Sequence, residues 1–163
     1  ILKKIDGVKE KYQTTSTLAY SVSIGLNDGN ILITGGLNST FTNVSGSVYL
    51  YNPKLENCIE KSSLLYSRYT HALAHHGNFV YAIGGRSING VLDHVKDTLL
   101  FEQMGEDSFF KLKKITTPAI VYEGTYIYVF GGYEGAGRID SIEQYYIAND
   151  IWNMMKIKFP LSV

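Results

Sequence analysis

One short phrase occurs three times along this chain and constrains its fold more than any other feature. Each copy is a run of β-branched and aromatic residues that ends in two glycines, and the copies span residues 30–36, 79–85 and 126–132. Such a run predicts a buried strand, and the glycine pair predicts a turn that needs positive φ angles or close approach of another backbone. The first glycines of successive pairs are 49 residues apart (35 to 84) and 47 residues apart (84 to 131). The chain is therefore a tandem repeat with a period of about 50 residues.

Each repeat is predicted to contain four short strands. The predicted strand segments are 17–24, 30–36, 47–51 and 58–65 in the first repeat, 70–75, 79–85, 97–102 and 108–113 in the second, and 119–122, 126–132, 141–147 and 152–157 in the third. Asn27-Asp28-Gly29 is a hairpin signal between the first two strands. Loops are expected after each glycine pair, at 37–45, 86–90 and 133–138. Four strands per unit, joined by tight turns, predict blades of a β-propeller rather than a sandwich or a solenoid.

Composition excludes some classes of partner. The chain has 163 residues with 15 basic and 15 acidic side chains, so no net charge favours nucleic acid or an anionic membrane surface. Its single cysteine, Cys58, cannot form an internal disulfide, which favours a reducing compartment. The sequons at Asn38 and Asn43 are interpreted as ordinary loop chemistry, and no apolar run reaches the ~18 residues that span a membrane.

From residue 17 to its end, the chain resembles the kelch repeat family. The resemblance rests on the three glycine pairs, on Tyr51-Asn52-Pro53, on Arg68-Tyr69-Thr70-His71-Ala72, and on Tyr145 followed seven residues later by Trp152. The first repeat departs from the pattern, because Cys58 stands where the third repeat has Trp152 and the Arg-His-Ala start is missing. The structural motif residues are Gly35, Gly36, Gly84, Gly85, Gly131, Gly132, Tyr51, Tyr145 and Trp152.

The resemblance implies an all-β, kelch-type β-propeller domain made of three four-stranded antiparallel blades. The expected repeats are 17–65, 66–113 and 114–163, and residues 1–16 are expected to be the end of a preceding blade and a linker. Large rings on the third and fourth strands, such as Tyr145 and Trp152, are expected to pack between adjacent blades.

Three blades are expected to be an incomplete propeller, because a blade cannot bury both of its faces alone. We expect a fragment of a propeller with about six blades, or a half that closes by pairing with another chain. The start at Ile1 rather than Met also suggests a longer protein.

Partner binding is expected where loops crowd around one end of the propeller. Arg and Tyr are favoured there, because Arg carries a planar donor fork and Tyr a large ring with few torsions. For Arg68 and Tyr69 the alternative is that they only complete the blade junction. Phe41 and Tyr66 belong to the same loops. The candidate partner-binding residues are Arg68, Tyr69, Arg86, Ser87, Asn89, Tyr133, Glu134 and Arg138.

Metal and catalytic interpretations are disfavoured. His75 and His76 are adjacent on a strand and point to opposite faces, and no carboxylate or thiol accompanies them at ligand spacing. His71 is interpreted as a structural residue. His94 does not complete a set of metal ligands with the other three histidines. Asp93, His94 and Ser87 lack the setting of a nucleophilic site. We expect no metal, no cofactor and no enzymatic activity.

The resulting hypothesis is a noncatalytic protein-interaction module in the cytoplasm, with a cytoskeletal or ubiquitin-ligase adaptor role implied by the resemblance. Two alternatives stay open. One is part of a propeller enzyme whose catalytic residues lie partly in missing blades, and the other is an architectural subunit of a large assembly.

Overall fold

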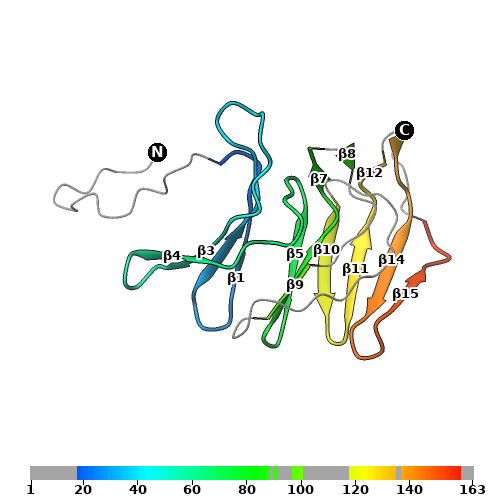
Figure 1. Cartoon of the computed structure of the whole chain (residues 1–163). Helices are drawn as coiled ribbons and strands as arrows, with labels where there is room; N and C mark the ends of the chain where they lie inside the picture. Colours follow the sequence, from blue (N-terminus) through cyan, green and yellow to red (C-terminus); the bar gives the residue numbers. More distant parts are fainter. Residues whose placement is uncertain (1–17, 89, 92–96, 101–117, 135–136, 159–163) are drawn as a thin grey trace, which may run out of the picture.

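The computed structural model describes residues 18–88, 90–91, 97–100, 118–134 and 137–158 (Figure 1). The regular elements of these residues are all strands. They are β1 (Val22–Gly25), β2 (Ile31–Thr34), β3 (Val48–Asn52), β4 (Asn57–Lys61), β5 (Ala72–His76), β6 (Phe79–Ile83), β7 (Arg86–Ser87), β8 (Gly90–Val91), β9 (Asp97–Leu100), β10 (Ala119–Glu123), β11 (Tyr126–Phe130), β12 (Tyr133–Glu134), β13 (Gly137–Arg138), β14 (Ile142–Tyr146) and β15 (Ile151–Met154). The segment 1–16 and the expected strand at 108–113 lie outside the described residues.

The strands form three successive antiparallel sheets, which we call blades 1, 2 and 3. Blade 1 has the order β1-β2-β3-β4, blade 3 the order β10-β11-β14-β15, and the described part of blade 2 the order β5-β6-β9. The first strand of blade 2, β5, contacts the first strands of both neighbours, β1 and β10. The blades therefore stand side by side around their first strands (Figure 1), which is the all-β blade architecture that the sequence predicts. Among the described residues there is no helix long and apolar enough to cross a membrane.

Two segments that the sequence analysis predicted as loops are paired hairpins. In blade 2, Arg86 pairs with Val91, and in blade 3, Tyr133 pairs with Arg138. Each hairpin follows directly after a glycine pair, at the end of the second strand of its blade. Two-residue strands carry too little alternation of apolar and polar residues for a periodicity argument to detect them.

Gly35 shows why the repeated phrase ends in glycine. Its φ angle is 62°, in the left-handed region, and a Cβ at this position would collide with the backbone carbonyl oxygen of Arg68, in the connection that leads into blade 2. The amide of the next residue, Gly36, donates a hydrogen bond of 2.8 Å to that same carbonyl. Both requirements predicted from the sequence, positive φ and close backbone approach, thus meet at one position.

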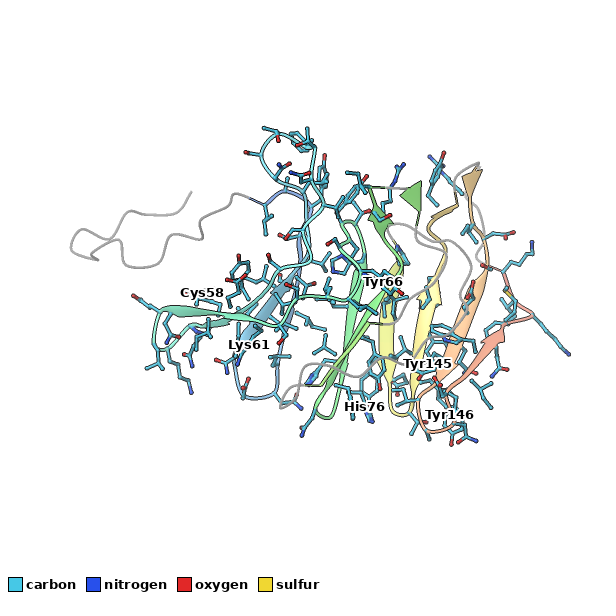
Figure 2. All side chains as sticks on the ribbon, viewed as in Figure 1. Cys58, Lys61, Tyr66, His76, Tyr145 and Tyr146 are labelled. Atoms are coloured by element: carbon cyan, nitrogen blue, oxygen red, sulfur yellow. The ribbon has the colours of Figure 1, made fainter. Side chains whose placement is uncertain are left out.

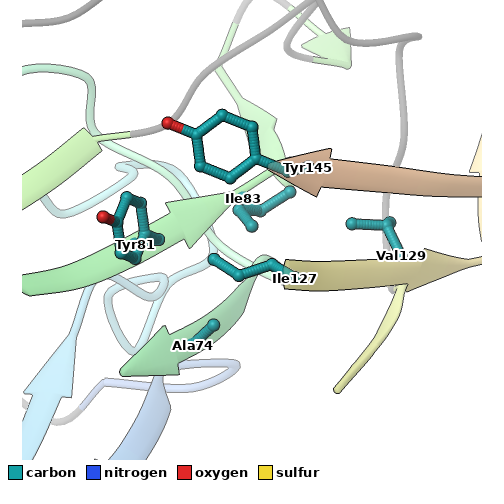
Figure 3. Close-up of a cluster of buried hydrophobic side chains, with 6 residues drawn as sticks. All are labelled: Ala74, Tyr81, Ile83, Ile127, Val129 and Tyr145. Carbon is teal, nitrogen blue, oxygen red and sulfur yellow. The ribbon is translucent and has the colours of Figure 1, made fainter. Parts of the chain in front are cut away.

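Two apolar clusters hold the blades together. Leu32 and Val48 of blade 1 pack with Val80 and Ala82 of blade 2, and Leu64 completes this cluster. On the other side of blade 2, Ala74, Tyr81 and Ile83 pack with Ile127, Val129 and Tyr145 of blade 3 (Figure 3). Successive residues of β6 thus serve opposite junctions, as expected for a strand buried on both faces.

The aromatic pair of the third repeat lies at a blade junction, as the sequence predicts. Tyr145 and Trp152 are directly opposite each other on β14 and β15, and their rings stack with centroids 4.8 Å apart. Tyr145 also meets Tyr81 of blade 2 edge to face at 6.0 Å. In blade 1 the corresponding opposed pair is Tyr51 and Cys58. Figure 2 labels Cys58, together with Tyr145 of blade 3.

Candidate partner-binding end

The connections between the second and third strands gather at one end of the blades, which we call the loop end (Figure 1). They are the loop 37–45 of blade 1, the β7–β8 hairpin of blade 2 and the β12–β13 hairpin of blade 3. The tight turns between the first and second strands lie at the opposite end. The fold thus places these three connections at the same end of the blades.

Loop 37–45 is fixed in shape by its own hydrogen bonds. The side-chain oxygen of Asn38 accepts from the backbone amides of Thr42 and Asn43 at 3.0 and 3.1 Å. The amide of Phe41 donates to the carbonyl of Asn38 at 2.9 Å. Phe41 therefore lies at the tip of a turn that is closed by hydrogen bonds. Asn38, the first residue of a sequon, stabilises that turn.

Three aromatic side chains form a cluster at the loop end. The rings of Tyr20 and Phe41 have centroids 6.2 Å apart, and those of Tyr20 and Tyr69 are 6.4 Å apart. The side chains of Tyr20 and Phe41 are 60% and 61% exposed, whereas Tyr69 is partly buried. We call Tyr20, Phe41 and Tyr69 the aromatic cluster.

The backbone beneath the aromatic cluster is held by pairs of hydrogen bonds. Ala19 exchanges two backbone bonds with Leu37, and Tyr69 exchanges two with Arg86, all between 2.7 and 3.0 Å. Tyr20 and Phe41 have φ angles of 58° and 56°. A left-handed conformation costs a bulky residue roughly 1–2 kcal/mol, so the surrounding structure must impose it. The exposed rings are thus presented on a fixed frame.

The predicted site residues separate into accessible and buried ones. Arg86 and Arg138 are exposed on β7 and β13, Tyr133 is 42% exposed on β12, and Ser87 is partly buried. Tyr69 belongs to the aromatic cluster. Glu134 lies in β12, but its side chain and all of Asn89 lie outside the described residues.

Arg68 lies at the blade junction, which is the alternative that the sequence left open. Its side chain is 0% exposed, and it donates hydrogen bonds to the carbonyls of Gly84 at 3.0 Å and Tyr66 at 3.2 Å. A guanidinium in this position has no surface with which to contact a partner. Its backbone carbonyl accepts from the amide of Gly36 at the end of β2, so Arg68 links blade 1 to blade 2.

His71 is buried beside Arg68 and bonds across the junction. Its Nε2 lies 2.7 Å from the hydroxyl of Thr34 in blade 1, and both residues are buried. Burial, and then the positive charge of Arg68, lower the pKa of His71 to about 3. The imidazole is therefore neutral at physiological pH and acts in packing, the role that the sequence predicts.

The other described histidines are engaged in local contacts. Nε2 of His75 lies 2.8 Å from the carbonyl of Gly77, and Nδ1 of His76 lies 2.5 Å from the hydroxyl of Tyr122 in blade 3. No group of three metal-ligating side chains occurs within the described residues. His94 and Asp93 lie outside them.

A small pocket lies at the opposite end, between the first turns of blades 1 and 2. Asn27 and Asp28 line one side of it, and His75 and Asn78 the other. Its volume of about 130 Å³ is below the 300–1,000 Å³ typical of small-molecule sites. The loop end is therefore the stronger candidate for binding.

Tyr20 is the cluster member that the sequence analysis missed. It stands inside a segment predicted as a strand, and a tyrosine gives no signal of a left-handed backbone. Phe41 was included among the loop residues of the first repeat. Only the folded arrangement brings Tyr20 next to both Phe41 and Tyr69.

Comparison with known proteins points to one family. A family model described as "Kelch motif" matches residues 119–156. Kelch-like protein 7 of Rattus norvegicus is 31% identical over 129 residues, which cover 74% of this chain and 22% of that protein. Kelch repeat and BTB domain-containing protein 2 of Ectromelia virus (strain Moscow) is 30% identical over 130 residues, covering 75% of this chain and 22% of that protein. The chain thus spans about a fifth of the length of these relatives.

A solved structure shares the fold at low sequence identity. The structure of YjhT superposes with a TM-score of 0.73 and 16% identity. The superposition covers 89% of this chain and 53% of that one. At this identity the likeness concerns the fold alone.

Proposed function

Because this chain belongs to the kelch repeat family, we propose that it is a noncatalytic protein-interaction module whose loop end binds a partner protein. The observation that carries the proposal is the aromatic cluster. Two large rings are mostly exposed there although their backbone occupies an unfavourable conformation. Exposed aromatic residues on a rigid frame are the usual anchors of protein interfaces, because they bury a large area with little loss of side-chain freedom.

The side chains around the cluster suit a protein surface. Arg86 is exposed, and its backbone exchanges two hydrogen bonds with that of Tyr69, a member of the aromatic cluster. Tyr133 and Arg138 pair with each other on the β12–β13 hairpin at the same end. An apolar anchor with polar groups at its margin is the common anatomy of an interface.

The finer assignments rest on the family. One relative combines kelch repeats with a BTB domain, as its name states. We propose a cytoplasmic location and a partner that is either a cytoskeletal protein or a substrate presented to a ubiquitin ligase. In either case, the loop end supplies the recognition surface.

A comparison of variants tests the proposal. The chain is immobilised and used to capture proteins from a cell extract, and the captured proteins are identified by mass spectrometry. The double variant Tyr20→Ala/Phe41→Ala is expected to lose a partner that the wild type retains, because an interface anchor contributes about 2 kcal/mol, or roughly 30-fold in Kd. The double variant Arg86→Ala/Tyr133→Ala is expected to bind the same partner more weakly.

Leu55→Ala is the matched control, since Leu55 is 70% exposed in the turn between β3 and β4, outside the loop end. Circular dichroism must be unchanged in every variant. A capture profile that is the same for the wild type and both double variants would remove the loop end as the binding surface.

A further inference from the structure

The aromatic cluster presents hydrogen-bond donors as well as rings. Within the part of the chain that the structure describes, the hydroxyls of Tyr20 and Tyr69 make no hydrogen bond. Tyr20 is 60% exposed, and the hydroxyl of Tyr69 is not among the enclosed polar atoms although its ring is partly buried. Each hydroxyl can therefore donate to a partner whose backbone carbonyls are free to accept.

Arg86 projects from the same side of the backbone as Tyr69. The two residues are directly opposite each other and exchange both backbone hydrogen bonds, at 3.0 and 2.9 Å. Side chains of directly opposed residues in an antiparallel pair leave the same face, with Cβ atoms about 5 Å apart. Arg86 is exposed and is in no ion pair among the described residues. Its side chain thus starts beside that of Tyr69 with its charge unpaired in this part of the chain.

The segments that form and flank the aromatic cluster contain no carboxylate. Residues 18–20, 37–45, 66–70 and 84–91 include two arginines and neither Asp nor Glu. Of the two arginines, Arg68 is buried and Arg86 is exposed. The exposed charge of these segments is therefore positive, and it is complementary to a partner that carries a carboxylate.

Building on the proposed function of the loop end, we propose that its partner is an extended, proline-rich segment that carries an acidic side chain. The ring centroids of Phe41 and Tyr69 lie 6.2 and 6.4 Å from that of Tyr20. A polyproline II segment rises about 3.1 Å per residue, so residues two positions apart are separated by about 6.2 Å, the spacing of the rings. Prolines dock on aromatic side chains in this conformation.

The free hydroxyls favour this conformation over a helix. Residues four apart in an α-helix are also separated by about 6 Å, but the helix bonds its own carbonyls and offers the tyrosines no acceptor. A polyproline II segment has no internal hydrogen bonds, so all its carbonyls remain available. Proline also fixes the segment before it binds, which lowers the entropic cost of binding to a surface of only three rings.

Fluorescence anisotropy with three labelled nonapeptides tests this partner chemistry on the full 163-residue chain. One peptide has three repeats of Pro-Pro-Glu, which place every carboxylate on one side of a three-residue turn. The second has Pro-Pro-Gln repeats and lacks the charge, and the third has Gly-Ser-Glu repeats and lacks proline. The Pro-Pro-Glu peptide is expected to bind roughly 1.5- to 5-fold more tightly than the Pro-Pro-Gln peptide, as for an exposed ion pair. It is expected to bind at least about tenfold more tightly than the Gly-Ser-Glu peptide, which has no anchor for the rings.

Variants assign each part of the recognition to a side chain. Arg86→Gln is expected to bind both proline peptides equally, at the wild-type affinity for the uncharged one. Tyr20→Phe keeps the ring, removes one donor, and is expected to weaken both proline peptides roughly 2- to 10-fold. Tyr20→Ala/Phe41→Ala is expected to abolish binding of both. Lys54→Gln is the charge-matched control, since it removes an exposed cation from the turn between β3 and β4 and is expected to retain wild-type affinities.

Three results would overturn the assigned chemistry. They are failure of the Pro-Pro-Glu peptide to bind, equal binding of the Gly-Ser-Glu peptide, and a preference for Glu over Gln that Arg86→Gln retains or that Lys54→Gln also loses. If Tyr20→Ala/Phe41→Ala still loses a protein captured from extract, such a result refutes the proline-rich partner and leaves the loop end as a binding surface. If the capture profile is unchanged as well, both proposals fail.

Discussion

The two blade junctions of this chain solve the same packing problem with different chemistry. Between blades 1 and 2 the buried side chains are aliphatic, and near the loop end they are joined by the polar residues Arg68, His71 and Thr34. Between blades 2 and 3 the buried cluster also contains two aromatic rings, Tyr81 and Tyr145, which contact each other. Backbone crowding and protonation at the first junction should therefore lower the stability of the fold. At the second junction, the loss of an aromatic ring should lower it.

The largest effect is expected from Tyr145→Ala in the aromatic junction. The ring is 3% exposed, stacks on Trp152 and donates a hydrogen bond of 2.6 Å to Asp150. Removing a buried aromatic side chain costs about 3–5 kcal/mol in the free energy of unfolding. Urea unfolding at fixed protein concentration measures this loss. Tyr133→Ala, at an exposed site, is the matched control, and an equal loss there would contradict the assigned core.

A somewhat smaller loss is expected from Gly35→Ala in the polar junction. A methyl group there meets the Arg68 carbonyl of the next blade, and the positive φ adds to the strain, so the cost is about 2–5 kcal/mol. Gly131 has the same place in blade 3, but its Cβ would lie 3.1 Å from Ile139 of its own blade. Gly77→Ala has positive φ with open space and should cost only about 1–2 kcal/mol.

Urea unfolding midpoints of the three glycine variants measure how much the close approach of another backbone adds to the cost of each substitution. We expect the loss for Gly35→Ala to exceed that for Gly131→Ala, and the loss for Gly77→Ala to be the smallest. Equal losses at Gly35 and Gly77 would mean that the close approach of blade 2 contributes nothing beyond the backbone conformation.

The smallest effect is a pH dependence of the polar junction. The folded pKa of His71 is about 3, against 6.5 for an ordinary histidine. Between these values the unfolded chain binds a proton that the folded chain does not, so stability is full above pH 6.5 and falls as the pH drops, by up to about 1.4 kcal/mol per pH unit. Urea midpoints between pH 7 and about pH 5, before carboxylates protonate, measure the slope.

Two substitutions separate the titration of His71 from its hydrogen bond. His71→Asn is expected to flatten the slope in this range, because the titrating group is gone. Thr34→Val removes the partner hydroxyl and is expected to lower stability by about 0.5–1.5 kcal/mol while the slope remains. A slope unchanged in His71→Asn would assign the acid sensitivity to another group.

Much of the fold could be predicted from local pattern. The glycine pairs, the strands before them and the opposed residues Tyr145 and Trp152 repeat at a fixed period, and period and alternation are properties of the chain itself. The hairpins at Arg86 and Tyr133 were not predicted, since two-residue strands have no pattern of their own. Of the residues that the sequence proposed for binding, Phe41, Tyr69 and Arg86 lie at the loop end, and their part in binding stays a prediction. Tyr20, which contacts Phe41 and Tyr69 there, was not among them.

The sequence by itself determined that this chain repeats a four-stranded blade and ends each second strand in glycine, because those features need only local geometry. Tertiary structure alone decided that Arg68 is buried between blades while Tyr20 is exposed on the surface. A side chain's accessibility depends on what the neighbouring blade places against it, and no local pattern contains that information.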